Sequence, residues 1–169
     1  MSFIVAPPSP EWPRLFLTLR DELHAAFAST PVDIEHIGST SVPGLCAKPV
    51  IDILVGAASL AQVEARIPAL RDAGYDYVSR HEAVIPMRRY FVKSPPDSLR
   101  VHVHAVVRDG DLWRDHLAFR DALRTDADLR ERYQALKLDL AARFAHDKSA
   151  YTEAKGPFIR EVIAALRDT

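Results

Sequence analysis

One carboxylate stands out because it interrupts an apolar run. Asp52 lies in the segment 49–55, whose other residues are nearly all apolar, as in a strand buried on both faces. Burying a charge without a partner is costly, so Asp52 must lie in a cleft or meet a cation or a hydrogen-bond donor. The candidate cations are Lys48, Arg88, Arg89 and Arg100. A structural ion pair and a functional site are equally compatible with this pattern.

A pair of histidines is the second chemical feature. His102 and His104 are two residues apart in a strand-like segment, so their side chains should point to the same face. Two imidazoles at that spacing can share a metal ion or an anionic ligand. A metal ion needs further ligands, for which His36 and Asp52 are the candidates near the same sheet. The commoner alternative for an isolated His-x-His is two half-exposed residues without a ligand.

The third feature is a turn that could hold phosphate. Gly38, Ser39 and Thr40 follow a strand-like segment. Glycine permits close backbone approach, and exposed backbone N–H groups and hydroxyls can bind phosphate oxygens. Most Gly-Ser turns are merely turns, so this signal is weak alone.

Basic side chains could complete such a phosphate site. Lys48, with Arg88 or Arg89, would neutralise phosphate charge. Tyr151 and Lys155 are four residues apart on an expected helix and could close the cleft from the helical side. Tyr133 and Lys137 share this spacing, although Tyr and Lys so placed are usually ordinary boundary packing.

The elements that position these residues follow from hydrophobic periodicity. Strands are expected at 32–38, 49–55, 87–93 and 99–107, with a short one at 75–80. Helices are expected from Pro10 to Phe27, over 59–74 with a break at Pro68, and at 112–124, 128–145 and 149–167, the last interrupted at Gly156-Pro157. The pattern predicts an α+β fold, a mixed β-sheet flanked by helices. We expect one domain over 1–169 with a helical C-terminal subregion at 110–169.

Composition excludes several classes of protein. The 169 residues include 22 Lys+Arg and 23 Asp+Glu, so no broad nucleic-acid surface is expected. Cys46 is the single cysteine and cannot form an internal disulfide. No run is long enough to cross a membrane, and the N-terminal residues do not resemble a signal peptide. A cytoplasmic protein is therefore expected.

The motifs resemble those of a known family. Residues 36–53 read HIGSTSVPGLCAKPVIDI, which is similar to the GrpB family signature HIGSTAVPGL followed by KPIIDI. The resemblance continues at His102 and His104, at residues 119–124 and at the two Tyr-x-x-x-Lys pairs. It covers nearly the whole chain and implies a nucleotidyltransferase-like fold.

The resemblance also implies roles for particular residues. In that superfamily a Gly-Ser pair follows the first strand, and three carboxylates on two later strands bind metal ions. Gly38-Ser39 fits the first element and Asp52 the second Asp of an Asp-x-Asp pair, but Val50 replaces the first Asp. No carboxylate is found in the strand of His102 and His104. Two-metal transfer with Mg²⁺ is poorly supported by this set, which better suits a softer ion.

The leading hypothesis is a nucleotidyltransferase-like protein that binds a nucleotide or another phosphate-bearing small molecule. Asp52, His102 and His104 are the candidate catalytic groups, with one divalent metal ion (Zn²⁺, Mn²⁺, Ni²⁺ or Mg²⁺) as the candidate cofactor. Two missing carboxylates leave catalysis open. The alternatives are a non-catalytic ligand-binding or protein-interaction module linked to cofactor metabolism, and a His/Asp metal-dependent phosphohydrolase.

Overall fold

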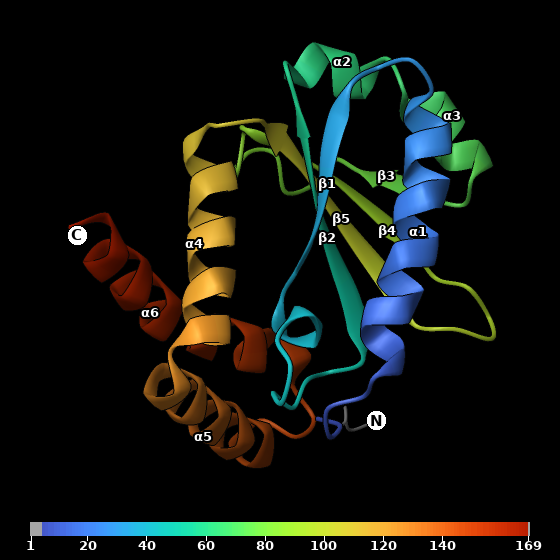
Figure 1. Cartoon of the computed structure of the whole chain (residues 1–169). Helices are drawn as coiled ribbons and strands as arrows, with labels where there is room; N and C mark the ends of the chain where they lie inside the picture. Colours follow the sequence, from blue (N-terminus) through green and yellow to red (C-terminus); the bar gives the residue numbers. More distant parts are fainter. Residues whose placement is uncertain (1–4, 169) are drawn as a thin grey trace.

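A five-stranded mixed β-sheet forms the centre of the molecule (Figure 1). The computed structural model describes residues 5–168. The strands lie in the order β1-β2-β5-β4-β3; β2 and β5 run parallel and the other neighbours antiparallel. Their bounds are Val32–Ile37 for β1, Val50–Ala57 for β2, Asp76–Val78 for β3, Arg88–Lys93 for β4 and Arg100–Val107 for β5. The predicted α+β class is confirmed.

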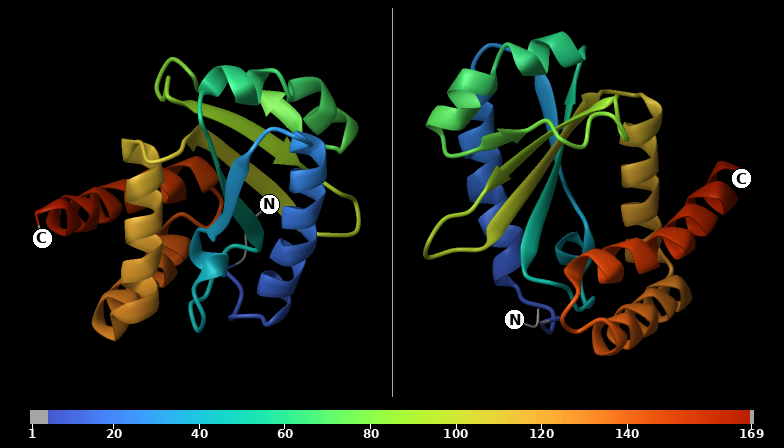
Figure 2. Two further views of the ribbon diagram at one scale, coloured as in Figure 1. Left: turned by 45° about the horizontal axis from the view of Figure 1, so that its top comes forward. Right: turned by 180° about the vertical axis from the view of Figure 1, so that it is seen from behind.

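Helices cover both faces of this sheet (Figure 2). Helices α1, α2 and α3 pack on one face, and α4 packs on the other with α5 and α6 beyond it. Their bounds are Glu11–Phe27 for α1, Leu60–Glu64 for α2, Ile67–Asp72 for α3, Asp111–Thr125 for α4, Ala127–Arg143 for α5 and Lys148–Arg167 for α6. None of these helices is both long and apolar enough to cross a membrane.

Two boundaries show how proline acts in this chain. The expected break at Pro68 is confirmed, because the segment forms two short helices, α2 and α3. The expected interruption at Pro157 is wrong: α6 continues through it. Proline removes one helical hydrogen bond, but α6 packs against both α4 and α5, and this packing holds the helix together.

The larger apolar core lies between the sheet and α1. The stripe Trp12, Phe16, Leu19, Leu23 and Phe27 is buried, as its spacing predicts. A smaller core on the opposite face joins Ile37, Leu54 and Val106 to Trp113 of α4. Strand β2 is therefore buried on both sides, and α4 stands close against it.

The closeness of α4 depends on a glycine. A Cβ added to Gly56 would lie 2.7 Å from the indole ring of Trp113, closer than a carbon contact allows. Gly56→Ala should lower the free energy of unfolding by about 1–3 kcal/mol, the usual cost of overpacking. Urea denaturation measures the effect. In a Trp113→Leu background the same substitution should cost less than half as much; an equal cost would contradict this contact.

Candidate functional site

A cavity of about 580 Å³ lies between the α4-covered face of the sheet and the helices α4, α5 and α6. Its walls also include the 3₁₀ turn Ser39–Ser41, which follows β1, and the segment 81–85 before β4. The volume falls within the range of small-molecule sites. Most of the residues singled out from the sequence line it: Gly38, Ser39, Thr40, Lys48, Asp52, Arg88, His102, His104, Tyr151 and Lys155.

Strand register brings Asp52 and the two histidines together. Asp52 pairs with His102 across the parallel β2–β5 ladder, and His104 is two residues further along. His104 in turn pairs with Tyr90 on β4. Paired residues on adjacent strands share a face, so all four side chains point into the cavity.

Both imidazoles approach one oxygen of Asp52. His104 Nε2 lies 3.3 Å and His102 Nδ1 3.6 Å from Asp52 Oδ1. Burial alone would raise the pKa of Asp52, but hydrogen bonds from His102 and His104 and the electrostatic interaction with both rings outweigh it. The pKa of Asp52 is therefore held well below its usual range, and the side chain is a carboxylate.

An arginine contacts the far nitrogen of each histidine. Arg88 Nη1 lies 3.2 Å from His104 Nδ1, and Arg100 Nε donates to His102 Nε2 at 2.9 Å. Arginine has only donors, so both of these ring nitrogens accept. From this network we assign each ring proton to the nitrogen that faces Asp52.

A third histidine, not singled out from the sequence, joins this cluster. His116 on α4 lines the cavity with its ring 5.7 Å from that of His104. Burial, and then the electrostatic interaction with His104, lower the pKa of His116 to about 4. A single histidine in an amphipathic helix gives no signal in the sequence.

Three lysines converge on the opposite wall. Lys48 precedes β2, Lys137 is on α5 and Lys155 is on α6. Burial first, and then the neighbouring lysines, lower the pKa of Lys137 to about 7 and that of Lys155 to about 8. The pKa of Lys48 is lowered as well, mainly by burial. Such depressed values mark a place where positive charge is buried and crowded.

The Gly-Ser turn lies directly against Asp52. Gly38 has φ +74°, and a Cβ there would lie 2.6 Å from Asp52 Oδ2. The hydroxyl of Thr40 donates to the carbonyl of Val50 and is 2.9 Å from His36 Nε2, from which it accepts. Thr40 therefore fixes the turn with its side chain, although it also lines the cavity.

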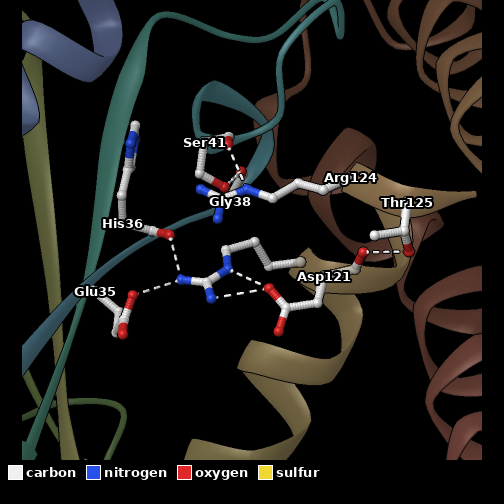
Figure 3. A network of polar contacts seen from close by, with 8 residues as sticks. Glu35, His36, Gly38, Ser41, Asp121, Arg124 and Thr125 are labelled. Atoms are coloured by element: carbon white, nitrogen blue, oxygen red, sulfur yellow. Dashed lines mark hydrogen bonds and ion pairs between the residues drawn. The ribbon is translucent and has the colours of Figure 1, made fainter.

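Helix α4 fastens this turn from the other side (Figure 3). Arg120 donates to Glu35 Oε2 at 2.7 Å and to the carbonyl of His36 at 3.2 Å. Arg124 donates to the carbonyl of Ser41 at 3.0 Å. The turn is thus held at a fixed distance from α4.

Two of the predicted site residues lie elsewhere. His36 and Arg89 point to the face covered by α1–α3, because each is one residue out of phase with the cavity side of its strand. His36 stacks on Phe16 with ring centroids 4.8 Å apart, and burial lowers its pKa to about 4. Arg89 Nε donates to Glu64 at 3.0 Å. The expectation that these two residues join the phosphate or metal site is therefore corrected.

The histidine cluster contains the residues of the predicted metal site. Within residues 5–168, no group of three or more His, Cys, Asp or Glu side chains is arranged to hold a metal ion. A single divalent ion at Asp52, His102 and His104 therefore stays a prediction from the sequence.

Comparison with known proteins identifies close relatives. A family model described as GrpB protein matches residues 2–165. The glutamate-rich protein GrpB of Alkalihalophilus pseudofirmus is 35% identical over 164 residues, covering 95% of this chain and 93% of that protein. The crystal structure of GrpB from Enterococcus faecalis is similar at a TM-score of 0.85, with 32% identity and 96% of both chains covered.

A more distant likeness concerns the fold alone. The structure of the Cid1 poly(U) polymerase matches at a TM-score of 0.57 and 15% identity, covering 88% of this chain and 49% of the polymerase. The predicted nucleotidyltransferase-like fold is confirmed by this match. At that identity the likeness carries no activity over to this chain.

The contact between Gly38 and Asp52 gives a matched pair of substitutions. Gly38 and Gly44 both have positive φ, but only Gly38 has a neighbour where a Cβ would be. Gly44→Ala should cost about 1–2 kcal/mol of stability from backbone strain alone. Gly38→Ala should cost clearly more, because Asp52 must also shift. Equal shifts in urea midpoint would show that the turn does not press on Asp52.

Crowding of the lysines should appear in the pH dependence of stability. Between pH 7 and 10 the unfolded chain binds more protons at Lys137 than the folded chain, so its contribution to the unfolding free energy rises with pH. Lys137→Met should remove about 2 kcal/mol of the rise between pH 7 and 9. Denaturation curves at each pH measure this difference. Parallel profiles for variant and wild type would contradict it.

Proposed function

The chain belongs to the GrpB family, and we propose that it binds a nucleotide or another phosphate-bearing small molecule in the cavity between the sheet and helices α4–α6. The observation that carries this proposal is the group of basic side chains in the cavity wall. Lys48, Arg88, Lys137 and Lys155 line it, and among the described residues that line it Asp52 is the only carboxylate. A bound anion would stabilise the protonated forms of Lys137 and Lys155, whose pKa values burial lowers.

Asp52 cannot neutralise these cations by itself. Its Oδ1 faces His102 and His104, and its Oδ2 lies against Gly38. Lys137 and Lys155 contact aromatic and backbone groups instead. Lys137 Nζ donates to the carbonyl of Cys46, and Lys155 Nζ lies 4.7 Å from the centre of the Tyr151 ring. Phosphate oxygens would supply the negative charge that these partners lack.

The rest of the wall suits the organic part of such a ligand. Apolar and aromatic side chains from the segment before β4, from β4 and from the helices α4, α5 and α6 also line the cavity: Ile85, Tyr90, Phe119, Tyr133 and Ile159. Mostly apolar walls with a few convergent polar groups are typical of small-molecule sites. A nucleoside or a similar flat group fits this combination.

The histidine cluster provides groups that could exchange a proton with a bound ligand. We include His102 and His104 in the proposal in this role, with Asp52 orienting both rings through its Oδ1. Two-metal nucleotidyl transfer is not part of the proposal, because Val50 and His102 offer no oxygen ligand where bridging carboxylates would be needed. Ligand binding is accordingly the function proposed.

Adjacent arginines on β4 allow a matched test. Arg88 faces the cavity and Arg89 faces the opposite side. Isothermal titration calorimetry with ATP should show binding that weakens with added salt and that adenosine does not reproduce. Arg88→Met should weaken ATP binding about 10-fold or more, because a charge-assisted hydrogen bond contributes roughly 1.5–3 kcal/mol. Arg89→Met should bind within about twofold of wild type.

Two outcomes would count against the proposal. One is the absence of binding by any compound in a series of ATP, UTP and pyrophosphate. The other is an equal loss in both arginine variants, once circular dichroism shows both to be folded. The second result would place the ligand outside the cavity.

A further inference from the structure

We propose that the segment 81–85 recognises the organic group of the ligand, with Val84 and Ile85 against a nucleobase or a similar flat group. This inference rests on the proposed function and deepens it, because it makes the ligand a nucleotide-like molecule rather than a bare phosphate. It follows from the exposure of one apolar side chain in the cavity wall, from the way the segment is fixed, and from its place beside Arg88.

Val84 is far more exposed than other apolar side chains that line the cavity. Its relative exposure is 82%, against 3% for Ile37, 2% for Leu123 and 4% for Tyr133. A residue that lines the cavity and is this exposed lies where the cavity opens to solvent. An apolar group placed against Val84 would remove this surface from water, and that burial favours binding.

The neighbouring aromatic ring, Tyr90 on β4, is already surrounded by protein groups. The guanidinium of Arg88 lies 4.7 Å from the centre of this ring. The rings of His81 and His104 lie 6.1 and 5.2 Å from it. The contact with His81 places the segment 81–85 next to Tyr90. Because Tyr90 is so enclosed, Val84 is the more open apolar surface for a ligand on this side of the cavity.

Hydrogen bonds within and beyond the segment fix this surface. The backbone N–H groups of Val84 and Ile85 both donate to the carbonyl of His81, at 3.1 and 3.0 Å. Glu82 accepts a hydrogen bond from the hydroxyl of Tyr77 on β3, so the segment is also tied to the sheet. A surface that is already in place loses less conformational entropy when a ligand binds.

A short turn joins this apolar surface to a side chain of the proposed phosphate site. The backbone N–H of Arg88 donates to the carbonyl of Ile85 at 3.2 Å, and both side chains line the cavity. Residues 81–85 themselves, HEAVI, include no lysine or arginine. A ligand whose phosphate contacts Arg88 would therefore have its attached organic group within reach of Ile85 and Val84.

Calorimetry with ATP and inorganic triphosphate as probes separates the organic group from the phosphates. Val84→Ser removes apolar surface from an exposed position, so it should weaken ATP binding about threefold or more. Triphosphate binding should stay unchanged, because this probe has no organic group. Met87→Ser is the matched control: Met87 is 55% exposed and near in the chain but does not line the cavity, so ATP binding should equal that of wild type.

The inference and the proposed function fail on different results. Equal ATP affinities for Val84→Ser and wild type would overturn the inference and leave the proposed function standing. An equal loss for ATP and triphosphate in Val84→Ser would do the same, because the segment would then act on the phosphates. So would an equal loss of ATP binding in Met87→Ser. Absence of wild-type binding to both probes, with Mg²⁺ and in EDTA, would overturn both.

Discussion

A half-buried, ionised carboxylate on the central strand is the constraint on which the rest of the site depends. Asp52 can stay charged there because β5 runs parallel to β2 in a register that sets His102 beside it and His104 one step further on. A slip by one residue would turn both histidines to the other face and leave the charge alone. The pairing of β4 with β5 places Tyr90 beside His104. The pairing of three neighbouring strands therefore positions most of the side chains on the sheet side of the cavity.

The opposite wall has the reverse character. Its lysines are buried and lie close to one another, and both conditions lower their pKa values. Keeping them protonated in the folded state therefore costs free energy. Local destabilisation of this kind is common where a protein is shaped for a ligand rather than for stability. The turn at Gly38 lines the same cavity, and Arg120 and Arg124 hold it at a fixed place against α4. The carboxylate and the ammonium groups thus line one cavity.

Much of this arrangement is encoded locally and could be predicted. The apolar stripe of α1, the break at Pro68 and the nearly all-apolar strand around Asp52 each depend on near neighbours in the chain. Arg88 and Arg89 show the limit: adjacent strand residues point to opposite faces, and only the pairing partner decides which face meets the cavity. His36 was out of reach for the same reason, because its face depends on the register of β1 against β2.

His116 and Lys137 were harder still to predict as cavity residues, because they reach the cavity only through the packing of whole helices.

The path of the chain also determines the order in which the parts of the cavity are synthesised. Residues 58–99 cross from β2 to β5 by way of α2, α3, β3 and β4, so the cavity face of the sheet is left open until α4–α6 follow. Domains begin to fold while the chain is still emerging from the ribosome. The sheet and its α1-covered core can therefore form early, with both histidines already beside Asp52. Lys137 on α5 and Lys155 on α6 arrive last, so a nascent chain passes through a stage that has the sheet side of the cavity but not these two lysines.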